Sequence, residues 1–375
     1  MSLKSIFCQD KAIDALQRAL AAGRMPHAYI FAGPDGVGKF KTACEWAKLL
    51  LCKSELKQNG FADSCGSCDS CRLFDAGSHP DFNFVYKELL EFTRDGKYRK
   101  TPLDLPIDVV REFVIEKVSS RPALSQRRVF VIAEAEKLNA SSQNALLKVL
   151  EEPPDYCLII LVCTRTEKLL PTTKSRCRII RFGLVDEQVI VAKVKQMGID
   201  QNQARYWARL SQGSLGQACQ WARLQLAGAE LYETGSQLLD RLVDYRYTQV
   251  LSVAEWLRGR ISKLSGVWAE LDEGTSKKDI NRRAQKTAVY IVISALRDVM
   301  KLGLCAATKD IINFDRQGQI RKLADRFNPE QSSERISDCY RTLRRIESNV
   351  SDRLAFEQLL FKLAPCDIIN LEKQQ

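Results

Sequence analysis

The sequence predicts an α/β domain with a parallel sheet, followed by helical segments that fill the rest of the chain. Short β-rich apolar runs alternate with helical patterns in the first half of the sequence. Strands that alternate with helices indicate a parallel sheet covered by helices on both faces. After Gly183 apolar residues recur every three or four positions, which is typical of helices. We therefore expect an α/β domain at 1–183, a small helical domain at 184–228 and an all-helical domain at 229–375.

The α/β domain is expected to begin with an amphipathic helix, because Ile13, Leu16 and Leu20 share one helical face. Asp10 is the expected N-cap of this helix, and Gly23 marks its expected end. Strands are expected at 28–32, 82–86, 129–133, 158–163 and 178–182. Further helices are expected at 39–52, 107–118 and 140–152, the last of which is ended by two prolines.

The second half of the chain is expected to hold helices only. Short helices are expected at 186–196, 201–210 and 215–226, and longer ones at 286–302 and 333–349. The polar segment 272–279 contains Gly, Thr and Ser and is expected to be a loop. This half therefore carries no predicted sheet.

Composition and charge restrict the classes of protein to which the chain can belong. The 375 residues are 45% hydrophobic with 19 Gly and 11 Pro, which excludes a disordered, collagenous or fibrous chain. The longest apolar run, 157–163, is too short for a membrane-spanning helix, which needs about 20 residues. Polar residues at 9–11 and 14 interrupt the apolar stretch that a signal peptide needs, so a cytosolic location is expected. The net charge of +11 suits a nucleic-acid or polyphosphate partner.

A glycine-rich loop stands between an expected strand and an expected helix. It matches the phosphate-binding motif G-x-x-x-x-G-K-[ST] at every fixed position but the last. The candidate phosphate-binding residues are Gly33, Gly36, Gly38 and Lys39, because such a loop offers backbone N–H groups and a lysine to phosphate oxygens. The last position of the motif supplies a hydroxyl to Mg²⁺, and Phe40 has none. The alternative is a glycine-rich turn beside a surface lysine.

An acidic pair at the end of a strand forms the second half of such nucleotide sites. Its Asp holds Mg²⁺ and its Glu polarises the attacking water. Here the strand 129–132 leads into Ala133 and Glu134, so the Glu position is filled and the metal-binding Asp is missing. Two metal contacts, at Phe40 and Ala133, are thus absent from one site, which indicates a nucleotide fold that does not hydrolyse. For Glu134 itself, a solvated carboxylate is favoured over catalysis.

Four of the chain's 13 cysteines form a compact cluster in the sequence. Cys52, Cys65, Cys68 and Cys71 have the spacing C-x12-C-x2-C-x2-C and offer four thiolates to a tetrahedral, structural Zn²⁺. An iron–sulfur cluster uses the same ligands and is the alternative. A cytosolic location argues against disulfides, and the other nine cysteines are interpreted as buried packing residues. His79 lies outside the cluster.

Four short segments carry a resemblance to a known family. They are Pro26-His27-Ala28-Tyr29, Asn144-Ala145-Leu146-Leu147-Lys148, Leu150-Glu151-Glu152-Pro153-Pro154 and Ser175-Arg176-Cys177. Together they resemble the AAA+ subunits of the bacterial clamp loader. The run 349–357 also resembles the end of one loader subunit. The resemblance spans the chain, and it is strongest in 1–182 and weaker in 230–375.

The resemblance implies an AAA+ phosphate-loop domain with a zinc module at 52–71, followed by a helical lid and an all-α collar. In that family a pentameric ring opens a sliding clamp and places it on primed DNA, with ATP between neighbouring subunits. The Arg of the Ser-Arg-Cys segment reaches into the next subunit's ATP site. Arg176 is therefore expected to be an arginine finger that acts in trans. The alternative is a surface arginine in the basic run 174–181.

Two sensor positions of the family bear on hydrolysis. Hydrolysing loader subunits carry an Arg directly after a Gly-Ser-Leu segment, where this sequence has Gly216. Thr164 matches the polar sensor that follows the fourth strand of the fold. The missing arginine agrees with the two lost metal contacts.

The leading hypothesis is a non-hydrolysing loader subunit that scaffolds the ring and presents Arg176 to a neighbour. Its expected partners are loader subunits of the delta and gamma/tau types, with the sliding clamp and primed DNA reached through the complex and no membrane involved. Its expected cofactors are structural Zn²⁺ and an ATP or ADP that is bound without hydrolysis.

Two rival hypotheses remain open from the sequence. One is an active ATPase subunit with unusual metal ligands, which Lys39 and Glu134 support. The other is an independent zinc-dependent nucleic-acid-binding protein. The basic segment 94–100 is interpreted as a solvated loop, so DNA contact is expected only within the complex.

Overall fold

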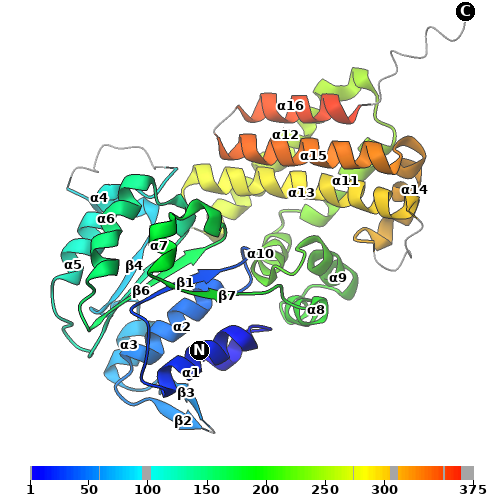
Figure 1. Ribbon diagram of the computed structural model, residues 1–375. Helices are drawn as coiled ribbons and strands as arrows, with labels where there is room; N and C mark the ends of the chain where they lie inside the picture. The colour runs from blue at the N-terminus through cyan, green and yellow to red at the C-terminus, as the bar shows by residue number, and fades with distance from the viewer. Residues whose placement is uncertain are drawn as a thin grey trace, which may run out of the picture. The chain divides into compact units, whose positions relative to one another are not determined.

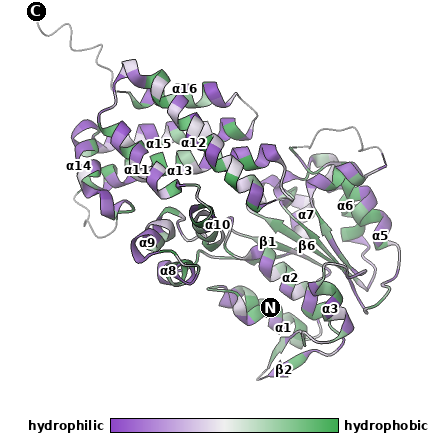
Figure 2. Cartoon of the chain, turned by 180° about the vertical axis from the view of Figure 1, so that it is seen from behind, coloured by the Kyte–Doolittle hydropathy of each residue, from purple (hydrophilic) through white to green (hydrophobic). Residues whose placement is uncertain are grey.

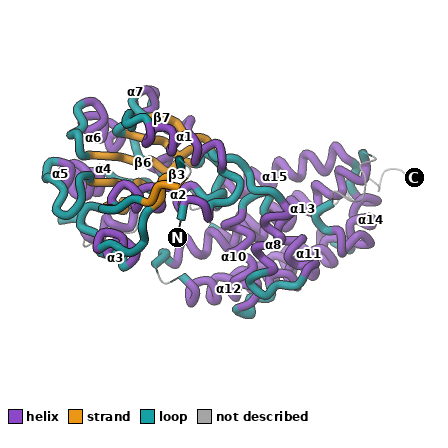
Figure 3. Tube along the Cα trace, turned by 90° about the horizontal axis from the view of Figure 1, so that it is seen from below, coloured by secondary structure: helices purple, strands orange, loops and turns teal. Residues whose placement is uncertain are grey.

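The computed structural model describes residues 2–58, 60–94, 103–272, 274–304, 311–348 and 351–364. The chain divides into two compact units. The first consists of Met1–Asp186 with Gly213–Gly216, and the second of Glu187–Gln212 with Gln217–Gln375. Within the described ranges all strands belong to the first unit, and the second is built from helices (Figure 3). Most of the basic segment 94–100 lies outside the described residues.

The first unit is built on a parallel sheet of five strands in the order β4-β5-β6-β1-β7. The strands are β1 (Ala28–Ala32), β4 (Phe82–Val85), β5 (Arg128–Ile132), β6 (Cys157–Cys163) and β7 (Arg178–Arg181). All four strand pairings are parallel. The central strand β6 is buried along its whole length and is apolar throughout (Figure 2). The predicted parallel sheet is confirmed, and each predicted strand lies within one residue of its observed bounds.

Helices cover both faces of this sheet (Figure 1). In β1, Ala28, Ile30 and Ala32 belong to one apolar core, while Tyr29 and Phe31 belong to the other. This alternation follows from the strand, whose successive side chains point to opposite faces. One face carries α1 (Asp10–Ala21), α2 (Lys39–Leu51) and α3 (Asp69–Asp75). The opposite face carries α4 (Ile107–Val110), the π-helical turn Arg111–Ile115, α5 (Glu116–Val118) and α6 (Ala140–Glu151).

The start of α1 corrects one prediction. Gln9, not Asp10, is the N-cap of this helix, and its side chain makes no capping bond. The Gln9 amide is used elsewhere, because Nε2 donates to the carbonyls of Val37 and Gly183, and Oε1 accepts the N–H of Gly183. The side chain therefore ties the start of the chain to the glycine-rich loop and to the end of the α/β segment.

The second unit is helical, as predicted. Its helices are α8 (Glu187–Lys195), α9 (Gln201–Leu210), α10 (Leu215–Leu226, which starts in the first unit), α11 (Leu231–Val243), α12 (Val250–Leu271), α13 (Lys277–Gly303), α14 (Gln317–Arg326), α15 (Pro329–Glu347) and α16 (Asp352–Leu363). The predicted start of α13 at 286 is wrong, because the helix begins at Lys277, where Ser276 caps it by accepting the N–H of Asp279. The predicted loop 272–279 is correspondingly shorter. None of the described helices has the length and apolarity needed to cross a bilayer.

Candidate functional site

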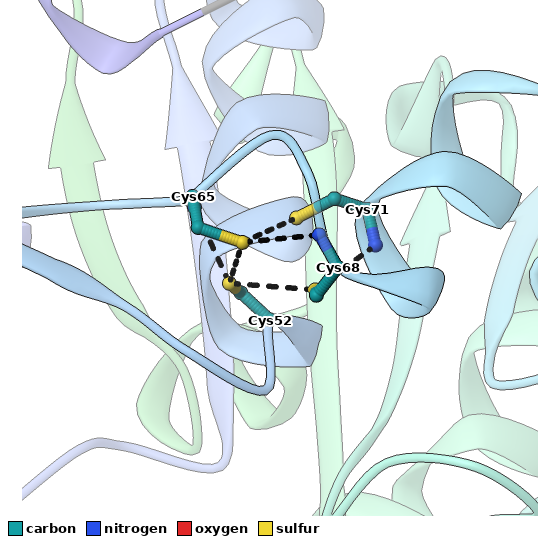
Figure 4. A group of neighbouring side chains, drawn as sticks. All are labelled: Cys52, Cys65, Cys68 and Cys71. Carbon is teal, nitrogen blue, oxygen red and sulfur yellow. Dashed lines mark hydrogen bonds between the residues drawn. The ribbon is translucent and has the colours of Figure 1, made fainter.

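The four predicted cysteine ligands lie together in the first unit (Figure 4). Cys52 follows α2, Cys65 and Cys68 lie on the loop before α3, and Cys71 is in α3. Their sulfur atoms are all within 4.8 Å of one another, and the Cys52–Cys65, Cys52–Cys68 and Cys65–Cys71 Sγ pairs are 3.5, 3.9 and 3.9 Å apart. A tetrahedral Zn²⁺ with Zn–S bonds of about 2.3 Å requires S–S separations of about 3.8 Å. The cluster is therefore consistent with a structural zinc site.

Backbone N–H groups around the cluster stabilise thiolates. The N–H of Cys65 donates to Cys52 Sγ at 3.3 Å, that of Cys68 to Cys65 Sγ at 3.3 Å, and that of Cys71 to Cys68 Sγ at 3.4 Å. Hydrogen bonds from the backbone of Ser67 and Cys68 lower the pKa of Cys65 to about 6. Burial raises the pKa of Cys71. A bound cation would favour the ionised form of all four thiols.

A short hairpin lies between Cys52 and Cys65, and the sequence patterns had not predicted it. The strands β2 (Leu56–Gln58) and β3 (Phe61–Asp63) pair antiparallel between Cys52 and Cys65. The Asn59-Gly60 pair is a common signal of a two-residue hairpin and could have identified it. The hairpin is tied to α1, since the Gln17 amide bonds to both the N–H and the carbonyl of Ala62 at 2.8 Å.

Buried polar side chains support the backbone next to two of the ligands. Ser70 Oγ donates to the carbonyl of Leu51 at 2.6 Å and lies 2.8 Å from His79 Nε2. The N–H of Asp81 donates to His79 Nδ1 at 3.1 Å, so Nε2 carries the proton and donates to Ser70. Burial lowers the pKa of His79, which agrees with a neutral ring. His79 thus lies outside the ligand set. Through Ser70 it supports Leu51, and these two residues directly precede Cys71 and Cys52.

The predicted phosphate loop connects β1 to α2, as its motif requires. The backbone of Phe182 passes so close to position 33 that only glycine fits there, because a Cβ would lie 2.5 Å from the carbonyl oxygen of Phe182. Lys39 is buried, and its Nζ donates to the carbonyls of Gly33, at 2.8 Å, and Pro34. Burial lowers the pKa of Lys39. The lysine that would bind phosphate is thus bonded to carbonyl oxygens of its own loop.

The two metal positions hold apolar side chains. Phe40 is 43% exposed, and its ring centroid lies 4.9 Å from that of Phe84 on β4. Ala133 follows β5, and its N–H donates to the carbonyl of Val85. Glu134 has the left-handed φ of 47°, and its carboxylate lies 2.6 Å from Lys137 Nζ. Its geometry is that of an ion-paired carboxylate at a strand end.

Thr164, the expected polar sensor, is bonded to Glu136, a residue that no sequence pattern singled out. Thr164 Oγ1 donates to Glu136 Oε1, and the N–H of Thr164 donates to Glu136 Oε2 at 3.1 Å. Glu136 follows the acidic position at the end of β5 by two residues and interacts electrostatically with Lys39. Both of its oxygens have Thr164 as a donor. No sequence motif marks this residue.

Gly216, at the position where the resemblance places a sensor arginine, lies at the start of α10. The N–H of Gly216 donates to the carbonyl of Gly36 at 2.7 Å, and a Cβ at Gly216 would lie 2.9 Å from Gly36 Cα. The residue at this position therefore packs directly on the phosphate loop. A side chain there requires the loop to move.

Replacing Gly216 by Ala is expected to destabilise the first unit by about 1–3 kcal/mol, because the added methyl overlaps the Gly36 backbone. Urea unfolding followed by circular dichroism measures this. The control is Gly259→Ala in α12, where a Cβ meets nothing within 4 Å and a gain of about 0.5–1 kcal/mol is expected. Unchanged stability of the Gly216→Ala variant relative to the wild-type chain would show that the loop yields without cost.

Arg176 is the C-cap of the short helix α7 (Pro171–Ser175) and lies two residues before the start of β7. Its Nη2 is 2.7 Å from Glu151 Oε1, and its Nη1 donates to the carbonyl of Thr172 at 3.0 Å. The start of α7 is fixed by Gln143 of α6, whose Oε1 accepts the N–H of Leu170 at 2.7 Å. The structure therefore holds Arg176 at a defined place against α6.

Arg176 and the phosphate loop lie at opposite ends of the sheet. Strands β1 and β7 are parallel neighbours, with Tyr29 paired to Arg178 and Ala32 paired to Arg181. Arg176 precedes β7, whereas the phosphate loop follows β1. At about 3.3 Å per strand residue, at least about 10 Å separates the two. The structure does not bring the arginine to the chain's own phosphate loop.

Two family models match the chain. The model described as DNA polymerase III, delta subunit, matches residues 8–186, and the model described as DNA polymerase III, delta subunit, C terminal, matches residues 277–364. Together they cover most of the first unit and much of the helical second unit.

Curated relatives of the same polymerase are similar to parts of the chain. DNA polymerase III subunit delta' of Pseudomonas aeruginosa is 37% identical over 151 residues, which are 40% of this chain and 41% of the relative. Subunit delta' of Bacillus subtilis is 28% identical over 204 residues, 54% of this chain and 56% of the relative. Subunit gamma/tau of Mycobacterium tuberculosis is 33% identical over 191 residues, 51% of this chain and 30% of the relative. The matches to the two delta' relatives thus span about half of those proteins. The chain belongs to the AAA+ clamp-loader family, as a member of its DNA polymerase III delta-prime subunits.

Proposed function

We propose that this protein is a non-hydrolysing subunit that scaffolds the clamp-loader ring and supplies Arg176 to a neighbour's ATP site. The observation that carries the proposal is the composition of the phosphate-loop site. The positions for metal binding hold Phe40 and Ala133, and the position of the sensor arginine holds Gly216, packed on the loop. Mg²⁺ neutralises the charge that develops during phosphoryl transfer, so a site without its ligands lacks the main source of rate enhancement.

The interior contacts of this site favour the same interpretation. Lys39 is bonded to the carbonyls of Gly33 and Pro34, and Glu136 is bonded to Thr164. The phosphates of a nucleotide could pair with the Lys39 ammonium group only after that group had left its two carbonyl partners. The glycine-rich loop still offers backbone N–H groups to phosphates, so ATP or ADP bound without hydrolysis belongs to the proposal.

The place of Arg176 supports a role in trans. It lies at the end of the sheet opposite its own phosphate loop, so its guanidinium serves a phosphate only if another subunit brings one. In AAA+ rings a guanidinium at the subunit boundary offsets charge on the γ-phosphate. The proposed partners are loader subunits of the delta and gamma/tau types. The sliding clamp and primed DNA are reached through the complex, in the cytoplasm. The proposed Zn²⁺ is held by the four cysteines and is structural, since four thiolates leave no open coordination position.

The competing function is that of an ATPase subunit, which the surviving Lys39 and Glu134 favour. The test is ATP turnover by the purified chain and by the loader reconstituted with Lys39→Ala. We expect no turnover by the chain alone and an unchanged loader rate with the variant, because Lys39 contacts no hydrolysed nucleotide. A turnover by the chain alone that disappears on Lys39→Ala would establish the ATPase instead.

A further inference from the structure

The guanidinium of Arg176 is fixed on two sides within its own subunit. Nη2 pairs with Glu151 Oε1 at 2.7 Å, and Nη1 donates to the Thr172 carbonyl at 3.0 Å. The same carbonyl accepts the hydroxyl of Ser175 at 3.0 Å, so it anchors both the arginine and the residue before it. A guanidinium has five N–H donors. The N–H groups of Arg176 that do not bond to Glu151 or Thr172 are therefore available to a ligand while these two contacts hold the guanidinium in place.

Glu151 occupies a place that helix electrostatics disfavours. It is the last residue of α6, where the partial negative charge of the helix C-terminus repels a carboxylate. The pairing with Arg176 offsets that repulsion. Both side chains are partly exposed, Arg176 at 35% and Glu151 at 48%, so the pair lies where another subunit can reach it.

We propose that Glu151 is the positioning residue for Arg176. It selects one rotamer of the arginine before a neighbour's nucleotide arrives, so that little side-chain freedom is lost when the guanidinium meets phosphate. This inference rests on the proposed trans role of Arg176. Glu151 does not touch the nucleotide, and it acts only through the arginine.

This role predicts a separation of kcat from KM. Without the carboxylate, the arginine samples several rotamers and only a fraction of encounters are productive, so kcat falls. The uncompensated positive charge still attracts ATP, so KM does not rise. A residue needed only to hold the subunit interface together would instead reduce the yield of assembled loader.

The experiment uses the reconstituted loader with primed DNA and measures ATP turnover against ATP concentration. The Arg176-dependent rate is defined as the wild-type rate minus the rate with Arg176→Ala. We expect Glu151→Gln to lower this Arg176-dependent kcat by about two- to fivefold, as for exposed ion pairs, with KM not raised. Glu152→Gln, which neutralises the adjacent exposed carboxylate, is the matched control and should leave kcat unchanged. In the Arg176→Ala background, Glu151→Gln should have no further effect.

The outcomes separate the inference from the function on which it rests. If Arg176→Ala lowers the rate while Glu151→Gln behaves as Glu152→Gln, the finger stands and the positioning role of Glu151 is overturned. A further loss from Glu151→Gln on top of Arg176→Ala also overturns it, because the carboxylate then acts independently of the arginine. If Arg176→Ala itself changes nothing in an intact loader, the proposed function fails and the inference falls with it.

Discussion

Replacing Arg176 by Ala is expected to reduce ATP hydrolysis at the neighbouring site that it serves by about 10³-fold or more. Arginine fingers contribute about 10³–10⁵ to the rate of γ-phosphate cleavage, because the fixed guanidinium offsets charge that develops in the transition state. The measurement is DNA-stimulated phosphate release from the reconstituted loader. The rapid phase of phosphate release should decrease in amplitude by the contribution of one ATP site.

Two controls accompany this variant. Arg176→Lys keeps the charge but not the planar fork, so it should remain defective. Arg178→Ala removes an exposed arginine two residues further along, at the start of β7, and should leave the rate unchanged. Size-exclusion chromatography establishes that the ring has formed. Full activity of Arg176→Ala in an intact ring, or equal losses for Arg176→Ala and Arg178→Ala, would contradict a specific finger.

Replacing Cys71 by Ser is expected to cause the largest loss of stability, about 4–5 kcal/mol, because loss of a structural metal is among the few mechanisms with effects of this size. Cys71 is the buried member of the four. The wild-type chain should contain one zinc per molecule by elemental analysis, and the variant none. Substitution by Co²⁺ should give the visible absorption of a tetrahedral four-sulfur site.

The control is Cys44→Ala, because Cys44 lies in α2 outside the cluster. This variant should retain its zinc and most of its stability. A purified chain that carries iron and sulfide, or that loses zinc to a chelator with no change in its unfolding midpoint, would contradict a structural zinc site.

The strands and the cysteine cluster could be predicted because their signals are local. The strand β6 is a run of seven apolar residues, and the ligand spacing is visible in a stretch of 20 residues, 52–71. The early start of α13 could not be found in the same way. Its first turns, from Lys277 to Arg283, are mostly polar, and only Ile280 among them is a buried apolar residue. Its helical face is therefore set by packing that no local periodicity reveals.

The contacts that distinguish this site depend on tertiary structure. Gln9 is a poor helix cap by sequence, and its role follows from Val37 and Gly183, the second of which lies 174 positions away. Glu136 and Glu151 are acidic residues without a motif, and only the folded chain places them beside Thr164 and Arg176. Sequence patterns identify the candidate positions of a nucleotide site, whereas the structure identifies what the side chains at those positions contact.

The measurement that tests the central claim most directly is the ATPase rate of loaders assembled with wild-type chain, Lys39→Ala or Arg176→Ala, compared side by side. The account predicts that Lys39→Ala equals wild type and that Arg176→Ala loses the contribution of the one neighbouring site, because the chain hydrolyses nothing itself and assists a neighbour. The reverse pattern, a loss with Lys39→Ala and full activity with Arg176→Ala, would contradict it.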